Sequence, residues 1–209
     1  MSAGSSGFGT GCRPIPGYHQ EVDPLKTLRF LPNLISFLRI ILVPFFVLEV
    51  LAGRPRTALI IFFTAGITDV LDGWAARSLD LRSRTGVWLD PAADKILLTA
   101  AFITLSLPGG IGPNLLPLWL TLAVIGRDVL LVAGSLVILL LRGVKQFPPS
   151  LVGKTSTVGQ VSTILAVLLF NATGHAVPEL SWLYALTLAL TGVSAVHYFM
   201  IGLGMMRRP

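Results

Sequence analysis

The sequence has little charge and almost no cysteine, and both scarcities restrict the kinds of protein it can encode. Only 12% of its 209 residues are charged, whereas 53% are hydrophobic. A soluble domain with one core needs a more polar surface, so this composition indicates a polytopic membrane protein. Cys12 is the only cysteine. The chain therefore has no intrachain disulfide, and its cysteine content does not indicate a redox compartment.

Two further kinds of sequence feature are missing. The net charge of +6 comes without a basic cluster interleaved with aromatic residues, so we expect no nucleic-acid partner. The basic excess instead fits cytoplasmic loops and attraction to anionic membrane lipids. No apolar run precedes Cys12, and the first apolar stretch, past residue 28, is long enough to span a bilayer. These features predict neither a lipoprotein signal nor a cleavable signal peptide.

Long apolar segments dominate the rest of the chain. Crossing the hydrocarbon takes about 20 residues of α-helix, and the segments that reach this length cover roughly 31–52, 56–79, 85–107, 114–141, 150–172 and 177–204. We therefore predict an all-α polytopic membrane protein with six transmembrane helices, forming one domain over residues 31–206. Residues 1–22, rich in Gly, Ser and Pro, predict a disordered tail. Residues 23–30 predict an interfacial segment.

Basic residues in the predicted loops set the orientation. With six spans both termini lie on one side, and that side carries eleven basic residues against two on the other. By the positive-inside rule both termini are cytoplasmic. The eleven are Arg13, Lys26, Arg29, Arg77, Arg82, Arg84, Arg142, Lys145, Lys154, Arg207 and Arg208; the two are Arg54 and Arg56. The second loop, which joins the second and third spans, then faces the cytoplasm.

Four carboxylates lie inside two of these apolar segments, where charge is costly and usually marks a site. In the second segment, positions i, i+3, i+4, i+7 and i+8 form one helix face and hold Asp69, Asp72, Gly73, Ala76 and Arg77. In the third, positions i, i+4 and i+8 hold Gly86, Asp90 and Asp94. Facing helices would aim four carboxylates at a common point. A hard divalent cation such as magnesium or manganese is the natural counterion.

Two simpler interpretations compete with this one. The carboxylates could form interhelical salt bridges, but within the two helices only Arg77 and Lys95 can balance them. We expect Lys95 to end a salt bridge or to reach toward the membrane interface. Gly73 and Gly86 could serve close helix packing. Together with Ala76 they instead favour a cleft that admits a planar nucleotide base.

The pattern D-x2-D-G-x2-A-R-x8-G-x3-D-x3-D, from Asp69 to Asp94, resembles at every defined position the signature of the CDP-alcohol phosphatidyltransferases. The looser resemblance extends over roughly residues 30–200. It implies a CDP-diacylglycerol donor whose CDP moiety is bound by Asp69, Gly73, Ala76, Arg77 and Gly86. It also implies metal ligation by Asp69, Asp72 and Asp90 and a two-ion magnesium or manganese site. Asp94 would be the base, a shared ligand, or both.

The acceptor-binding residues are sought among other charged residues within spans. Family members that accept phosphorylated alcohols place basic residues there, and this chain offers Arg39, Arg127 and Lys154. Each is costly at membrane depth unless it is paired or bound to an anion. Arg127 could instead simply pair with the adjacent Asp128.

The stretches at 32–40 and 90–95 resemble the glycerol-phospholipid branch, which contains phosphatidylglycerophosphate synthase and CMP-forming cardiolipin synthase. Glycerol 3-phosphate is the first expected acceptor, because nearly all bacteria need its product. Phosphatidylglycerol is the alternative acceptor. It is favoured by Gly126-Arg127-Asp128-Val129, because phosphatidylglycerophosphate synthase usually carries Arg-Glu at this place. A bacterial inner-membrane location and a homodimer follow from the same resemblance. A cation transporter or a scaffold explains the crowded aspartates less well.

Overall fold

The computed structural model describes residues 31–78, 86–109, 111–142 and 150–207. Within these ranges the described side chains exclude those of 31–37, 69–78, 86–93, 138–139, 141–142 and 205–207. The predicted tail (1–22) and interfacial segment (23–30) lie outside the described residues.

The described chain is all-helical, as predicted, and each predicted span corresponds to one helix with ends shifted by a few residues. The helices are α2 (Leu31–Leu51), α3 (Pro55–Ser78), α4 (Gly86–Leu105), α5 (Leu118–Arg142), α6 (Leu151–Thr173) and α7 (Leu180–Arg207). By length and composition, three stretches of the described residues could cross a membrane: Leu118–Val137, Leu151–Thr173 and Leu180–Gly204. A shorter apolar stretch, Pro55–Thr68, lies in the part of α3 whose side chains are described.

Local sequence explains where the helices begin and end. The fourth predicted span was placed from residue 114, but α5 starts at Leu118, directly after Pro117, whose ring is best tolerated at the start of a helix. At the start of α6 the Ser150 side chain accepts a hydrogen bond from the Gly153 N–H at 3.0 Å. At its end Gly174 adopts a left-handed conformation with φ 74°, which costs glycine little.

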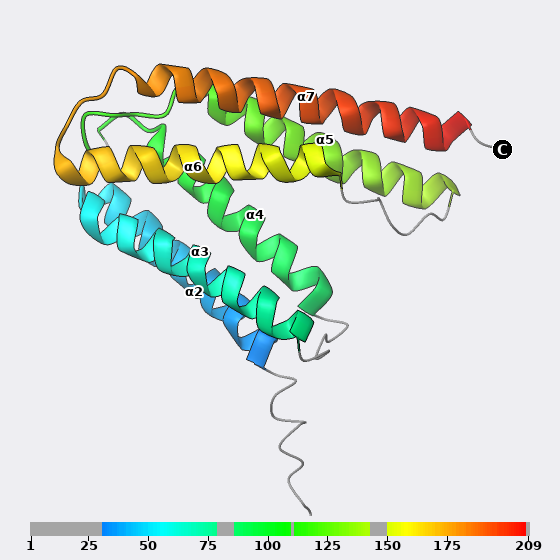
Figure 1. Ribbon diagram of the computed structural model, residues 1–209, viewed down its shortest axis with the longest axis horizontal. Helices are drawn as coiled ribbons and strands as arrows, with labels where there is room; N and C mark the ends of the chain where they lie inside the picture. Colours follow the sequence, from blue (N-terminus) through cyan, green and yellow to red (C-terminus); the bar gives the residue numbers. More distant parts are fainter. Residues whose placement is uncertain (1–30, 79–85, 110, 143–149, 208–209) are drawn as a thin grey trace, which may run out of the picture.

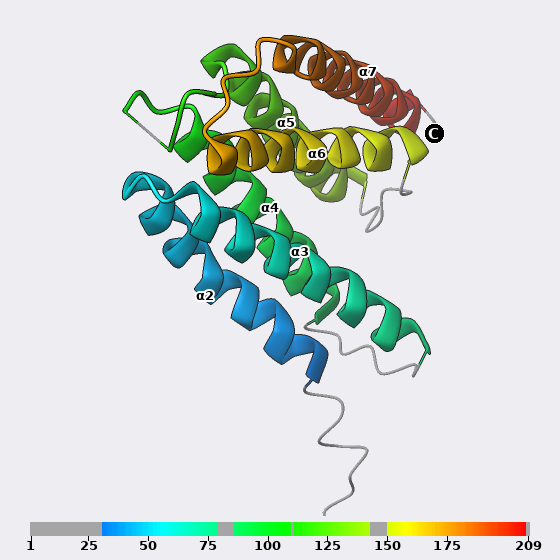
Figure 2. The same cartoon turned by 60° about the vertical axis from the view of Figure 1, so that its left-hand side comes forward.

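The helices form two groups joined through α4 and α6. Helix α2 packs against both α3 and α4, α5 packs against α7, and α6 packs against α3 and α7. The two groups lie close at the end that carries the 52–54 and 174–179 connections and diverge toward the other end, where α3 ends and α4 begins (Figures 1 and 2). The motif helices therefore meet the rest of the molecule mainly through α2 and α6.

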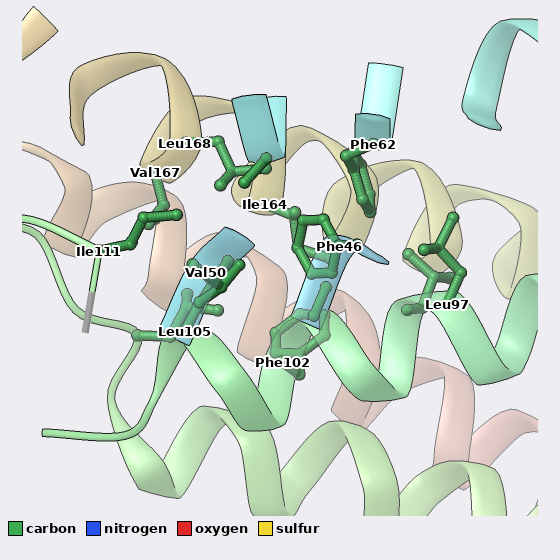
Figure 3. Close-up of a cluster of buried hydrophobic side chains, with 14 of the residues drawn as sticks. Phe46, Val50, Phe62, Leu97, Phe102, Leu105, Ile111, Ile164, Val167 and Leu168 are labelled. Atoms are coloured by element: carbon green, nitrogen blue, oxygen red, sulfur yellow. The ribbon is translucent and has the colours of Figure 1, made fainter. Parts of the chain in front are cut away.

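The apolar core fills the end at which the groups converge. Its buried side chains include Phe46 and Val50 of α2, Phe102 of α4 and Ile164 of α6 (Figure 3). Phe46 also contacts Phe62 of α3, with ring centroids 5.7 Å apart. This core fixes the positions of α2, α3, α4 and α6 at that end.

Two buried asparagines fasten the connection between α4 and α5 to the end of α6. The Asn171 carbonyl oxygen Oδ1 accepts from the Asn114 backbone N–H at 2.9 Å and from Asn114 Nδ2 at 3.0 Å. Asn171 Nδ2 donates to the Asn114 backbone carbonyl at 2.9 Å. Asn114 in turn donates to the His175 carbonyl at 2.7 Å and accepts from the Val177 N–H at 2.9 Å. One side chain thus satisfies both backbone groups of Asn114.

We expect Asn171→Ala to lower the thermal unfolding midpoint of the purified protein clearly. It leaves the Asn114 N–H and carbonyl without their partner, and each buried unsatisfied group costs about 1–3 kcal/mol. Thr173→Ala is the matched control, because Thr173 is exposed and bonds only the Phe170 carbonyl. Equal midpoints for the two variants would show that the asparagine pair does not hold this end together.

Candidate active site

The complete aspartate motif lies on two successive helices, as its spacing predicts. Asp69 to Arg77 belongs to the last turns of α3, and Gly86 is the first residue of α4. The backbone is helical throughout both segments, so the i, i+3 and i+4 relations of the motif hold. The side chains of Asp69, Asp72, Ala76, Arg77 and Asp90 and the surroundings of Gly73 and Gly86 lie outside the described residues; their predicted roles stay predictions.

Asp94, the last aspartate of the motif, contacts a buried arginine from α2. Arg39 Nη1 donates to Asp94 Oδ1 at 2.5 Å. The Arg39 side chain is 1% exposed, whereas that of Asp94 is 40% exposed. A rigid, buried cation therefore orients a carboxylate that remains accessible. This contact joins residues 55 positions apart in the sequence.

Lys95 is held by a different helix. Its ammonium donates to both carboxylate oxygens of Asp128 on α5, at 2.8 Å each. Asp128 Oδ1 also accepts from Arg127 Nη1 at 2.8 Å. One carboxylate is thus shared by two cations. Adjacent residues of α4, Asp94 and Lys95, are consequently attached to α2 on one side and to α5 on the other.

Arg127 extends this cluster to α7 and α6. Its Nε and Nη2 donate to Ser194 Oγ at 3.2 and 2.5 Å, and its guanidinium lies 5.6 Å from the centroid of the Tyr198 ring. Gly153, in the first turn of α6, makes room for this ring, because a Cβ there would lie 2.6 Å from Tyr198 Oη. Ion pairing, hydrogen bonds and a cation–π contact together compensate a guanidinium that is only 4% exposed.

The predicted acceptor-binding residues have distinct surroundings. Arg39 is directed at Asp94, and Arg127 pairs with Asp128, which is the alternative considered for it from the sequence. Lys154 is exposed, and its ammonium has no hydrogen bond or ion pair with another residue of the described ranges. The expectation that Lys95 ends a salt bridge is confirmed by its contact with Asp128.

The structure corrects the predicted pairing of Lys95. Lys95 was counted as available to the motif carboxylates, but it is bound by Asp128, which is not part of the motif. Arg39, which was not counted, is paired with Asp94. Within the motif itself, Arg77 is the one basic residue beside the four aspartates.

Ser194 and Tyr198 were not identified from the sequence. Each is one of several polar or aromatic residues on a mostly apolar helix, and no spacing rule links it to Arg127, which lies 67 positions before Ser194. Among the described side chains no group of three or more His, Cys, Asp or Glu could hold a metal ion. Asp94 is the one predicted metal ligand whose side chain is described.

We expect Asp128→Asn to destabilise the protein more than Lys95→Met or Arg127→Met. Removing the carboxylate leaves the buried Arg127 and the partly exposed Lys95 without their shared counterion, and an uncompensated buried charge is strongly destabilising. Removing either cation leaves Asp128 paired with the other. The thermal unfolding midpoints of the three variants, measured in one detergent, give the order. A midpoint for Asp128→Asn equal to that of Lys95→Met would contradict this assignment.

Comparison with known proteins agrees with the motif. A family model described as CDP-alcohol phosphatidyltransferase matches residues 29–201. The chain therefore belongs to the CDP-alcohol phosphatidyltransferase family. The match includes α2 to α6, α7 as far as residue 201, the aspartate motif and the Lys95–Asp128–Arg127 cluster.

Individual relatives carry two kinds of name. A Bacillus subtilis protein, CDP-diacylglycerol–glycerol-3-phosphate 3-phosphatidyltransferase, is 34% identical over 156 residues, covering 68% of this chain and 77% of that protein. The CMP-forming cardiolipin synthase of Homo sapiens is 30% identical over 188 residues, covering 80% and 61%. A Mycobacterium tuberculosis protein with a provisional cardiolipin synthase name is 36% identical over 141 residues, covering 66% and 64%. The matches span less than two thirds of the human and mycobacterial proteins.

Proposed function

We propose that this protein transfers the phosphatidyl group of CDP-diacylglycerol to the hydroxyl of a glycerol-based acceptor and releases CMP. The observation that carries the proposal is the placement of Asp94. It closes a complete family signature, is oriented by the buried Arg39, and is exposed enough to meet a substrate.

In this reaction the acceptor oxygen forms a bond to the phosphorus that bears the lipid, and the bond from that phosphorus to CMP breaks. An alcohol is a poor nucleophile until a base removes its proton. Asp94 would take that proton. Arg39 would hold the carboxylate in one orientation through its contact with Oδ1.

The donor set of the motif fits a hard divalent cation in its chemistry, because it consists only of carboxylate oxygens. Asp69 and Asp72 stand at i and i+3 of continuous helix, and Asp90 and Asp94 stand at i and i+4, so each pair shares a face. The motif itself carries four aspartates and one arginine, so a bound cation would offset its excess of negative charge. Magnesium or manganese bound there would neutralise phosphoryl oxygens and stabilise the leaving group.

We further propose that all six helices cross the membrane, with both termini and the motif at the cytoplasmic side. The excess of basic residues in the loops on that side supports this arrangement. The fold is compatible with it, because α3 ends and α4 begins at the same end of the molecule (Figure 1).

Two acceptors are proposed, glycerol 3-phosphate first and phosphatidylglycerol second. The name of the Bacillus relative supports the first, and the names of the human and mycobacterial relatives support the second. The test is purified protein with CDP-diacylglycerol and magnesium, supplied in parallel with glycerol 3-phosphate, phosphatidylglycerol, inositol phosphate and serine. Lipid products are identified by mass. CMP release with either glycerol-based acceptor supports the function; no CMP release with any acceptor rejects it.

We expect Arg77→Lys to raise the KM for CDP-diacylglycerol more than the KM for the acceptor. An arginine fork can pair with two phosphate oxygens at once, whereas a lysine offers a single point charge. Initial rates with each substrate varied in turn measure the two constants. Unchanged donor KM in the variant would mean that Arg77 serves only as a structural ion-pair partner.

A further inference from the structure

An apolar groove lies between α5 and α7, in the halves of these helices that end at Arg142 and Arg207. It encloses about 300 Å³, and its lining is apolar or small apart from Arg127, Ser135 and Tyr198. Two lining side chains, Leu130 and Phe199, are 67% and 68% exposed, so the groove is open to the surroundings.

Small residues create this hollow. Ala133 and Gly134 line it from α5, and Ala195 and Gly202 line it from α7. A Cβ added at Gly134 would meet no other atom within 4 Å. The helices therefore pack against each other through Arg127, Ser194 and Tyr198 but leave space beyond them.

The surroundings restrict what fills this space. The groove lies along the membrane-crossing stretches Leu118–Val137 and Leu180–Gly204, where hydrocarbon replaces water. Arg127, at the inner end of the groove, needs no polar group from a ligand, because Asp128, Ser194 and the Tyr198 ring already contact its guanidinium. An acyl chain matches such an environment. The volume is at the lower limit of small-ligand pockets and too small for a helix about 10 Å across.

Charge at the helix ends favours an anionic headgroup. The groove ends near Val137 and Leu203, and Arg142 and Arg207 follow five and four residues later as the last residues of α5 and α7. At 1.5 Å per residue these are distances of about 7 and 6 Å along the helices, the level at which a phosphate stands above its acyl chain. Basic sites between transmembrane helices on the cytoplasmic side bind anionic lipid headgroups.

We propose that this groove is a binding site for one anionic phospholipid of the adjacent leaflet. One acyl chain lies between Leu130 and Phe199, and the phosphate lies at the level of Arg142 and Arg207. The site is separate from the aspartate motif on α3 and α4; the proposal rests on the proposed membrane orientation but not on the proposed transferase activity. The bound chain contacts the Tyr198 and Arg127 end of the groove and so abuts the cluster that holds Lys95.

The test measures lipid retention rather than activity. The full-length protein is equilibrated with equal amounts of dioleoylphosphatidylglycerol and dioleoylphosphatidylcholine, and bound lipid is counted by native mass spectrometry. Gly134→Leu fills the groove. Gly126→Leu is its matched control: it lies on the same helix, its Cβ also meets nothing within 4 Å, and it does not line the groove. Arg142→Gln with Arg207→Gln removes the charge and leaves the groove intact. Thermal unfolding confirms that each variant is folded.

We expect the parent and Gly126→Leu to retain one phosphatidylglycerol. Gly134→Leu should bind phosphatidylglycerol at least about tenfold more weakly, because displacing only two methylenes of a buried acyl chain weakens binding by about this factor. The arginine variant should keep lipid but lose the preference for phosphatidylglycerol. Equal retention by the two leucine variants overturns the proposal. So does a change in Gly134→Leu from dimer to monomer with lipid retention unchanged, because the groove would then be a contact between two copies.

Discussion

Asp94→Asn should abolish phosphatidyl transfer while CDP-diacylglycerol still binds. The amide has nearly the shape of the carboxylate, and its oxygen can still accept the hydrogen bond from Arg39, so the position of the side chain is retained. It has no charge with which to take the acceptor proton. General-base contributions are commonly about a hundred- to ten-thousand-fold in rate, and the loss should appear in turnover.

The other role open to Asp94 is that of a fourth metal ligand. In that case donor affinity and metal affinity would fall together with rate, and added metal would partly restore turnover. Calorimetric binding of CDP-diacylglycerol to the variant, repeated across a magnesium titration, separates the two roles. Retained binding with no turnover at any magnesium concentration supports the base, and recovery of turnover at high magnesium rejects it.

Asp69→Asn and Asp90→Asn should each lose most turnover, and a chelator should abolish turnover of the parent. Three carboxylates beside the single arginine of the motif need additional positive charge to share one site. Removing one ligand weakens that site and misplaces the diphosphate of the donor. Added manganese or magnesium should restore the chelated parent, since the protein itself is unchanged.

A carboxylate at the opposite end of the molecule provides the control for these variants. Glu179 is exposed and stands just before α7, at the end away from the motif. Glu179→Gln removes the same charge and should leave CMP release unchanged. Equal CMP release by Asp69→Asn, Asp90→Asn and Glu179→Gln, or CMP release that persists in excess chelator, would reject the metal assignment.

The contacts of α4 suggest why both classes of variant need a stability control. Asp94 and Lys95 are adjacent, yet the first is held by α2 and the second by α5. A loss of either contact changes how α4, and with it Asp90, is oriented relative to α3. The thermal unfolding midpoint of each variant should therefore be measured together with its turnover. The Lys95→Met and Asp128→Asn variants show how much turnover is lost when α4 is displaced but the motif is unchanged.

The sequence alone determined the helical architecture, the motif and the family. Long apolar runs fix where helices form, and prolines such as Pro117 and glycines such as Gly174 fix where they begin and end, because these are local backbone preferences. The spacing from Asp69 to Asp94 is likewise local, since it depends only on the helical period. These predictions needed no knowledge of which helices pack together.

The partners of the charged residues were decided only by the tertiary structure. Arg39 pairs with Asp94 across 55 positions, Lys95 with Asp128 across 33, and Arg127 with Ser194 across 67. The helical period places residues on a face, but the neighbour of that face and the rotation of each helix follow from packing of the apolar core. For this reason Lys95 was counted with the motif from sequence, whereas the folded chain assigns it to α5 and gives Arg39 to Asp94.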